Sequence, residues 1–334
     1  MAVEWYEVFV GMLLMAYILR DQQKYVSEVK VLEELFEHFR DSGEVKLLAD
    51  AWSMMGDALR CLGEGKLSVE AFKKAVEVEP ALEQKLVECS NAIFSANAIA
   101  GVTADYMQSL YVLYRELLGN LSVRPYSPAV WKHKKIRVGY ISADLRDHAV
   151  AQFVRPMLCQ YYKEKFAVYV YSVTRHPDKV TEALQQGGAL WRDVSADRWP
   201  QIVEQIRFDE IDILVDLAGH SADNALPVFA WRPATVQISG IGYFNSIGMH
   251  EMQGFLSDVY CSEADTSPYF TENLLRLPHS HLCYQPFADF PEVGQPPCLQ
   301  CCPRGSSMRI FALLHLRIAM TALLLTIRCM SVLA

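Results

Sequence analysis

The sequence lacks the excess of basic residues that a nucleic-acid-binding surface needs. Its 31 Lys and Arg are outnumbered by 39 Asp and Glu, which gives a net charge of -8 and a pI near 5.6. A broad phosphate-contacting face is therefore not expected, and nucleic acid is not predicted as a partner. With 334 residues, of which 51% are hydrophobic and 21% charged, the chain is long enough for two folded domains.

The sequence also lacks a recognisable metal or disulfide framework. Nine cysteines are an odd number, and Cys298, Cys301 and Cys302 form a C-x-x-C-C cluster without a second pair at ligand spacing. Reduced thiols and a cytoplasmic location are expected, with no resident metal and no cofactor. A metal or redox role for the cysteine cluster is the alternative.

A targeting or membrane segment is missing as well. No basic residue precedes the apolar run Val8 to Leu19, which is too short to span a bilayer and has no cleavage site, so it predicts a core helix. The apolar stretch Phe311 to Ile327 carries His315 and Arg317 near its middle, and inserting a charge there costs several kcal/mol. A membrane partner is not expected, and a membrane tether through this tail is the alternative.

Residues 1 to 120 have the periodicity of helices. The apolar residues between Val31 and Phe39 recur at helical spacing, with glutamates between them, as in an amphipathic surface helix. Residues 49 to 82 fit one tetratricopeptide unit, which cannot bury its own apolar face. Further helical pairs are therefore predicted within residues 5 to 45 and 84 to 118.

Each position of the repeat has a packing reason. Gly56 and Ala75 allow two helices to approach, while Trp52 and Phe72 fill the space between them. Gly63 and Gly65 form the turn, and Pro80 ends the second helix. This array is either a concave surface that binds a protein partner or acceptor peptide, or a helical cap that shields the following domain.

Residues 121 to 135 form a linker into an α/β domain over residues 136 to 297. Strands and helices alternate there, which predicts a mostly parallel sheet with helices on both faces, a Rossmann-like half-unit. No G-x-G-x-x-G follows the first strand and no Walker motif is present, so a nicotinamide or Walker-type site is disfavoured. The expected strands are 137–142, 167–173, 191–194, 211–217, 235–239 and 254–256, and the expected helices are 150–162, 179–186 and 199–207.

The loop after the first strand is the main candidate for chemistry. The stretch KIRVGYISADLRDHAV ends an apolar strand at Ser142, Ala143 and Asp144 and places His148 before the next helix. In open α/β sheets such a loop borders the ligand crevice. A histidine titrates near neutrality and can accept a proton from an attacking hydroxyl, so His148 is a candidate general base. Alternatively it caps the following helix.

Four segments in order carry a resemblance to a known family. They are RVGYISADLRDHAV from Arg137, DILVDLAGHSADNALPVFAWRPATVQ from Asp212, GYFNSIG from Gly242 and LLRLPHSHLCYQP from Leu274. Together they resemble the catalytic region of protein O-GlcNAc transferases, particularly the bacterial and SPINDLY-like members, over Lys135 to about Pro297. The resemblance implies an α/β fold: a helical, tetratricopeptide-like region and then one Rossmann-like half of a two-Rossmann, GT-B type glycosyltransferase.

The resemblance also implies site residues and substrates. The family transfers N-acetylglucosamine from UDP-GlcNAc to protein Ser or Thr, and His148 matches a histidine that lines its active site. His220 would act on the acceptor side or in support, and Tyr243 would stack on a ligand or simply pack. Arg232 is either a loop-fixing arginine or a phosphate clamp. The predicted substrate-binding residues are Asp144, Gly219, His220, Ile241, Gly242 and Tyr243.

Residues 298 to 334 depart from the family pattern. They show no alternation of strands and helices, and no counterpart of the lysine and helix terminus with which the family's second half holds the diphosphate. The change at Cys298 to Arg304 is what a truncated or frame-shifted product would show, so impaired transfer is expected. The alternative function is a non-catalytic tetratricopeptide scaffold that binds protein partners.

Overall fold

The computed structural model describes residues 2–40, 42–121, 123, 126, 133–263 and 269–287. The chain forms two compact units. The first comprises Met1–Arg124 with two later segments, His220–Ala230 and Ile247–His250, and the second contains the sheet. Most of the linker and all of the tail, including Cys298, Cys301, Cys302 and the apolar stretch 311–327, lie outside the described residues, so the domain limits there stay predictions.

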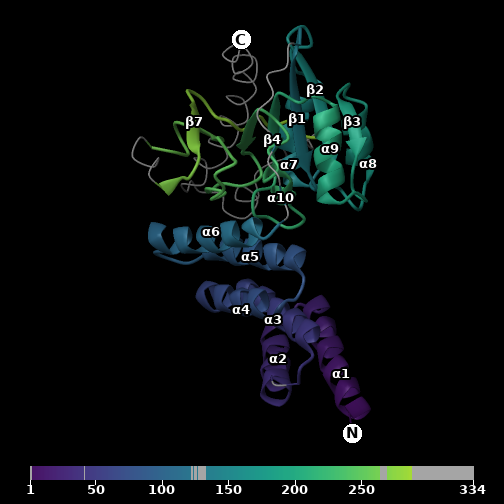
Figure 1. The fold of residues 1–334 in the computed structure, drawn as a ribbon, viewed down its shortest axis with the longest axis vertical. Coiled ribbons are helices and arrows are strands. Elements are labelled where there is room, and N and C mark those ends of the chain that lie inside the picture. The colour runs from purple at the N-terminus through teal and green to yellow at the C-terminus, as the bar shows by residue number, and fades with distance from the viewer. Residues whose placement is uncertain are drawn as a thin grey trace, which may run out of the picture. The chain divides into compact units, whose positions relative to one another are not determined.

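Consecutive helices build the first unit, and each packs against the next along the chain (Figure 1). The helical pairs expected within residues 5 to 45 and 84 to 118 are present on either side of the tetratricopeptide-like pair. The helices are α1 (Ala2–Asp21), α2 (Tyr25–Phe39), α3 (Val45–Cys61), α4 (Gly65–Val78), α5 (Leu82–Ala96) and α6 (Ala104–Gly119).

The repeat packs largely as its sequence predicts. A Cβ on Gly56 would lie 2.8 Å from the ring of Phe72, so only glycine lets α3 and α4 approach this closely. Gly63 has a φ of +81° in the turn, and α4 ends at Val78, two residues before Pro80. Trp52 differs from the prediction. It stacks on Phe36 of α2, with ring centroids 3.8 Å apart, and so links the repeat to the preceding pair.

The expectation that residues 8 to 19 form a core helix is wrong for half of α1. Phe9, Leu13 and Ala16 are buried against α2 and α3, but the opposite side is exposed. Only one side of α1 is buried, because within its unit α1 packs against other helices on that side alone. No described helix, α1 included, is long and apolar enough to span a membrane. The large apolar side chains of α1 that are at least half exposed are Trp5, Tyr6, Val8, Leu14, Met15, Tyr17 and Ile18.

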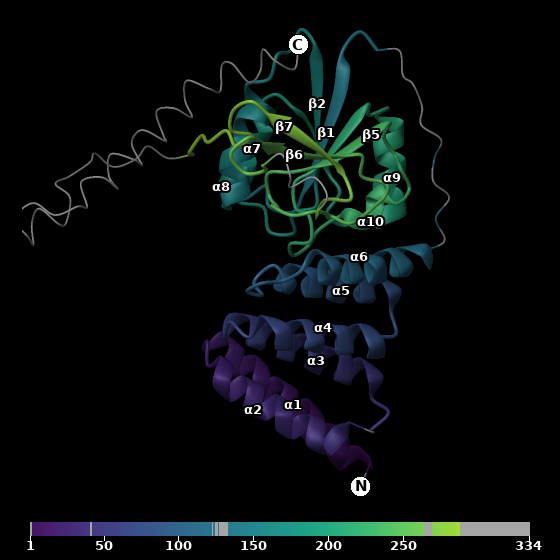
Figure 2. The ribbon, with the colours of Figure 1, turned by 90° about the vertical axis from the view of Figure 1, so that its left-hand side faces the viewer.

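The second unit is built on a parallel sheet (Figure 2), and its strands lie in the order β3-β2-β1-β4-β5-β6-β7. Six of these strands were expected from the sequence, and β7 was not. It begins with Asn273, and Arg276 interrupts its apolar residues, so it shows neither alternation nor a continuous apolar run. The strands are β1 (Ile136–Ser142), β2 (Phe166–Ser172), β3 (Leu190–Asp193), β4 (Ile213–Asp216), β5 (Val236–Ser239), β6 (Gly254–Asp258) and β7 (Asn273–Leu277).

Helices cover both faces of the sheet, as expected. Figure 2 shows α7 (Ala149–Cys159) and α8 (Lys179–Gln185) on one face and α9 (Trp199–Phe208) on the other. Val154 and Leu158 of α7 are fully buried in one core with Val170 of β2. Parallel strands are apolar on both sides because helices bury both faces, which explains their nearly continuous apolar runs. A short helix, α10 (Leu226–Phe229), was not predicted.

Gly56→Ala should destabilise the helical unit by about 1–3 kcal/mol, because the new methyl group meets the fully buried ring of Phe72. The matched control is Gly11→Ala in α1, where nothing lies within 4 Å of the added carbon. There the gain in helix propensity should stabilise by about 0.5–1 kcal/mol. Urea unfolding of both variants measures the difference, and equal effects would contradict the proposed close approach.

Candidate functional site

The candidate site lies where the strand order reverses. From β1 the chain builds outward through β2 to β3, then returns to place β4 on the other side of β1. The crevice beyond the carboxyl ends of two such strands is the usual ligand site of an open α/β sheet. The three loops that the sequence singled out follow β1, β4 and β5, which are neighbours in the sheet. One edge therefore carries all three.

Hydrogen bonds with the segment after β2 fix the backbone of the β1 loop. The hydroxyl of Thr174 donates to the carbonyl of Ala143 (2.9 Å), and that of Thr181 donates to the carbonyl of Leu145 (2.7 Å). The backbone N–H of Asp147 donates to the carboxylate of Asp178 (2.7 Å). Because these contacts fix the backbone, the loop presents His148 outward, with 42% of its side chain exposed.

His148 is the N-cap of α7. Its Nδ1 accepts a hydrogen bond from the N–H of Val150 at 3.3 Å, so the neutral ring carries its proton on Nε2. The carboxylate of Asp144 lies 3.8 Å from the same Nδ1. With the proton on Nε2, this nitrogen can donate a hydrogen bond but cannot accept one. The helix-capping alternative is therefore present in the structure, and a role as base requires a different proton position.

A buried carboxylate shapes the β4 loop. Asp216 is fully buried and accepts hydrogen bonds from the N–H groups of Ala218 (3.1 Å) and Gly219 (2.8 Å). The hydroxyl of Ser239 on β5 donates to it at 2.5 Å. Burial raises the pKa of this carboxyl group, although the three hydrogen bonds act in the opposite direction. Asp216 thereby joins the ends of β4 and β5.

Two glycines bring the loops after β4 and β5 into contact. A Cβ on Gly242 would lie 1.7 Å from the carbonyl oxygen of Leu217, and one on Gly219 would lie 2.4 Å from Tyr243. Gly219 has a φ of +55°, and Ile241 has a φ of +76°, which is rare for a β-branched residue. No larger side chain fits at either glycine. The main chain of the β5 loop therefore lies directly on the β4 loop.

The aromatic residues of this edge divide into one that packs and one that is exposed. Tyr243 is 3% exposed, which favours the packing alternative over stacking on a ligand. The next residue, Phe244, stacks on Tyr243 with ring centroids 5.5 Å apart and is 71% exposed. An aromatic surface is thus available at this edge, but Phe244 provides it.

His220 is enclosed within the first unit. Its Nε2 lies 2.8 Å from the carbonyl oxygen of Ile247 and must donate, so Nδ1 accepts from the hydroxyl of Ser90 at 3.0 Å. The edge of Tyr114 contacts the ring, and His220 has no exposed surface. Burial lowers the pKa of His220 to about 4, so it is neutral at physiological pH. Both nitrogens are occupied, and direct contact with a sugar is not available in this arrangement.

The structure thus divides the predicted site residues. Asp144, His148, Ile241 and Gly242 are at least partly exposed on loops of one sheet edge, whereas Gly219, His220 and Tyr243 are buried. For Arg232, no described residue accepts a hydrogen bond from the buried Nε, so neither of its alternatives gains support. Their roles in binding or catalysis stay predictions.

Two surface hollows occur on the sheet unit. One is beside α9 and includes Pro200, Glu204 and Phe208. The other includes Ile136, Ile213 and Val236, at the amino ends of β1, β4 and β5. Neither hollow is lined by a residue of the three loops. The strand order, rather than a closed cavity, is what marks the carboxyl edge as the candidate site.

Asp216 is the site residue that the sequence analysis missed. It was included in an expected strand without comment, although an ionisable residue at the end of an apolar run is itself unusual. An acidic residue in this position predicts a buried carboxylate that hydrogen-bonds to the neighbouring loop.

Sequence comparisons place these loops within a known family. The sequence model described as glycosyl transferase family 41 matches residues 118–293. The chain is 31% identical over 237 residues to the rice protein named probable UDP-N-acetylglucosamine–peptide N-acetylglucosaminyltransferase SPINDLY, covering 68% of this chain and 24% of that protein. The Arabidopsis thaliana protein of the same name is 37% identical over 166 residues, covering 48% of this chain and 18% of the relative. The chain therefore spans about a quarter or less of these relatives.

A solved structure has the same fold. A mutant O-GlcNAc transferase from Thermobaculum terrenum aligns with 83% of this chain and 59% of its own length, with a TM-score of 0.54 and 22% identity. At this identity the match supports the architecture only. A helical amino-terminal region followed by a parallel sheet, the fold class expected from the sequence, is confirmed.

The buried His220 should make stability depend on pH. Its folded pKa of about 4 lies below the usual 6.5, so the unfolded chain binds the proton first. The neutral ring of His220 therefore contributes fully to the free energy of unfolding above about pH 6.5. That contribution is lost as the pH falls toward 4, and the loss amounts to up to about 3 kcal/mol. Unfolding free energies of the parent and His220→Gln, measured across this range, should show a shallower slope for the variant.

A direct measurement complements the unfolding curves. The ring proton signals of His220 in an NMR titration should not shift between about pH 7 and pH 5, because the imidazole remains neutral there. A histidine signal assigned to this residue with a midpoint near 6.5 would contradict the enclosed position.

Proposed function

The chain belongs to glycosyl transferase family 41, and from that membership we propose that it serves the transfer of N-acetylglucosamine from UDP-GlcNAc to serine or threonine hydroxyls of proteins. The sheet unit supplies one wall of the transfer cleft, formed by the loops after β1, β4 and β5. The observation that carries the proposal is the position of His148, half exposed beside the strand-order reversal. A cytoplasmic location, suited to such acceptors, is part of the proposal.

The donor lies along the β5 loop. Gly242 has no side chain, so the main chain there can approach the sugar, and the exposed ring of Phe244 offers a stacking surface to a sugar or base. The contacts of Gly242 and Gly219 fix this backbone before any ligand arrives. Preorganised main-chain groups of this kind bind a polar ligand without first paying for loop ordering. No cofactor takes part.

His148 acts on the acceptor. The acceptor oxygen attacks the anomeric carbon, the bond from that carbon to the phosphate oxygen breaks, and its electron pair leaves with UDP. The hydroxyl proton moves to Nε2 of His148. Nε2 can accept only after the ring proton has moved to Nδ1, so the hydrogen bond from Val150 N–H must give way.

Asp144 is the positioning residue for that change. Its carboxylate is 3.8 Å from Nδ1 of His148, close enough for a small turn of the ring to form a hydrogen bond from Nδ1–H. Such a bond holds the tautomer whose Nε2 is a base, and it stabilises the imidazolium that forms during transfer. Asp144 thereby promotes catalysis by orienting His148 and does not itself contact the substrate.

The helical unit binds the acceptor protein in this proposal. A non-catalytic scaffold is the second candidate, favoured by one observation: α1 exposes Trp5, Tyr17 and Ile18 among other large apolar side chains, as a protein-binding surface does. The two functions differ in whether UDP-GlcNAc is used at all.

His148→Ala should lower transfer by about 10²–10⁴-fold, because the acceptor hydroxyl loses its base. The full chain is incubated with labelled UDP-GlcNAc and a serine-rich acceptor peptide. His38→Ala, which removes an exposed histidine on α2, is the control and should leave transfer unchanged. A parent chain that shows neither transfer nor UDP binding would rule out the enzymatic function and leave the scaffold.

Asp144→Asn should lower kcat on the order of tenfold, less than loss of the imidazole itself, and leave the KM for UDP-GlcNAc unchanged. Steady-state kinetics separate these parameters. The control is Asp147→Asn, an exposed carboxylate three residues along the same loop. A raised KM with normal kcat would instead assign Asp144 to substrate binding.

A further inference from the structure

Three side chains with metal-binding atoms meet at the far end of the same sheet edge. Asp258 is the last residue of β6, Cys261 lies in the turn that follows, and His281 lies beyond β7. Strands β6 and β7 are parallel neighbours with Asp258 opposite Leu277, so their carboxyl ends lie side by side. One ligand atom from each of the three residues lies within 4.8 Å of the others.

Asp258 is an ionised carboxylate at the base of this cluster. Its side chain is 1% exposed, and its oxygens accept hydrogen bonds from the N–H groups of Tyr260, Cys261 and His281, at 2.8, 2.8 and 2.9 Å. Burial acts to raise the pKa of Asp258, but these bonds and the one from the His281 ring outweigh it and hold the pKa well below its usual range. The carboxylate is therefore negatively charged and held in one orientation.

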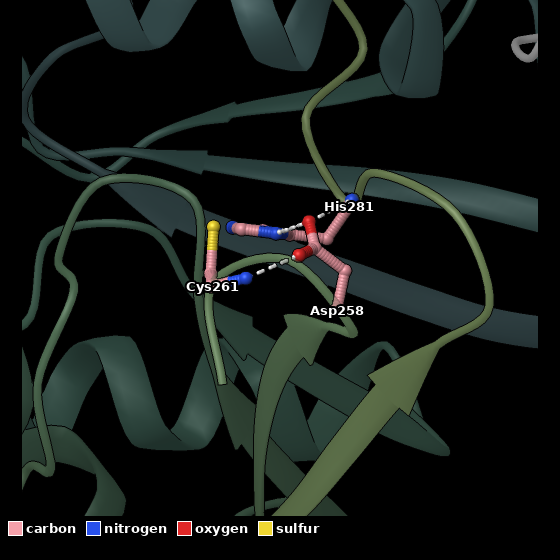
Figure 3. Close-up of side chains that lie close together, drawn as sticks. All are labelled: Asp258, Cys261 and His281. Carbon is pink, nitrogen blue, oxygen red and sulfur yellow. Dashed lines mark hydrogen bonds and ion pairs between the residues drawn. The ribbon is translucent and has the colours of Figure 1, made fainter. Parts of the chain in front are cut away.

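The imidazole of His281 is oriented by this carboxylate. Its Nδ1 lies 2.6 Å from Oδ2 of Asp258, and since a carboxylate only accepts, Nδ1 carries the proton. The lone pair of the neutral ring is then on Nε2, which hydrogen-bonds to no described residue. Figure 3 shows the ring lying between the carboxylate of Asp258 and the sulfur of Cys261. A histidine whose far nitrogen donates to a carboxylate is the usual arrangement of a metal-bound histidine.

We propose that Cys261 and His281 bind a thiophilic divalent ion of the Zn²⁺ class through Sγ and Nε2, with Asp258 holding the imidazole and water completing the coordination. Thiolate and imidazole suit zinc and are poor ligands for Mg²⁺ or Ca²⁺. The ion ties the turn after β6 to the segment after β7. This site is independent of the proposed sugar transfer.

Binding releases a proton. A thiol binds a divalent ion as its thiolate, so Sγ of Cys261 gives up its proton when the ion binds. The ion displaces this proton to solvent as the metal–sulfur bond forms, and no electron is transferred. Affinity should therefore increase with pH. The negative charge of Asp258 favours the cationic complex.

Co²⁺ titration tests the site, because a thiolate–cobalt bond gives a charge-transfer band. The full chain is used with Cys298→Ser, Cys301→Ser and Cys302→Ser in every variant, which removes the cysteine cluster of the tail. In this background one equivalent of Co²⁺ should give the band, and Zn²⁺ should displace it. The band should be lost in Cys261→Ser and in His281→Gln. Cys61→Ser, which removes an exposed thiol on α3, should keep it.

Two further measurements separate loss of ligand from loss of fold. Zn²⁺ should raise the melting temperature of the background chain but not that of Cys261→Ser, whose own melting temperature without metal should be unchanged. Asp258→Asn should keep the band with affinity weakened by about 10–100-fold. The proposal is overturned if no charge-transfer band forms, or if the band persists in Cys261→Ser.

Discussion

The position of β1 between β2 and β4 is the constraint on which the rest of the molecule's chemistry depends. Because the chain builds outward on one side of β1 and then returns to the other, the loops after β1 and β4 leave the sheet in different directions, the arrangement that forms the ligand crevice of open α/β sheets. His148 and Asp144 lie on one of these loops, and the main chain of Leu217 and Gly219 lies on the other. A strand order without this reversal would cover the same residues with a crossover connection.

Tight backbone packing gives this edge its shape. Gly242 lies against the carbonyl of Leu217, and Gly219 lies against Tyr243, so the loops after β4 and β5 cannot separate without losing both contacts. Asp216 strengthens the arrangement through two backbone N–H groups and Ser239, at the cost of burying a carboxylate. A buried polar group that is fully hydrogen-bonded fixes one geometry, and preorganisation of this kind is what a transfer site needs.

The two ends of this edge have different chemistry. Beside β1, the half-exposed imidazole of His148 lies 3.8 Å from the carboxylate of Asp144. This carboxylate can stabilise the tautomer with its proton on Nδ1, which suits acid–base catalysis. Beside β6 and β7 the imidazole of His281 is held at 2.6 Å by a buried carboxylate and lies beside a thiol, which suits metal binding. The same pair of residue types is thus proposed for two roles, which differ because the two histidines differ in exposure and in the third group beside them.

The sequence by itself determined what depends on near neighbours along the chain. Gly56, Phe72 and Pro80 identified one repeat, and the need to cover its apolar face predicted helical pairs on either side of it. The alternation of apolar segments located six strands within a few residues of their limits. Four segments in order, among them those around His148 and Gly242, indicated the family. Only the tertiary structure decided which strands are adjacent, that Trp52 packs on Phe36, that His220 is enclosed beside Ser90, and that Asp258 meets His281. These contacts join residues that are 16 to 130 positions apart in the sequence. Local periodicity shows only which face of its own helix or strand a residue occupies. It carries no information about which distant element will cover that face.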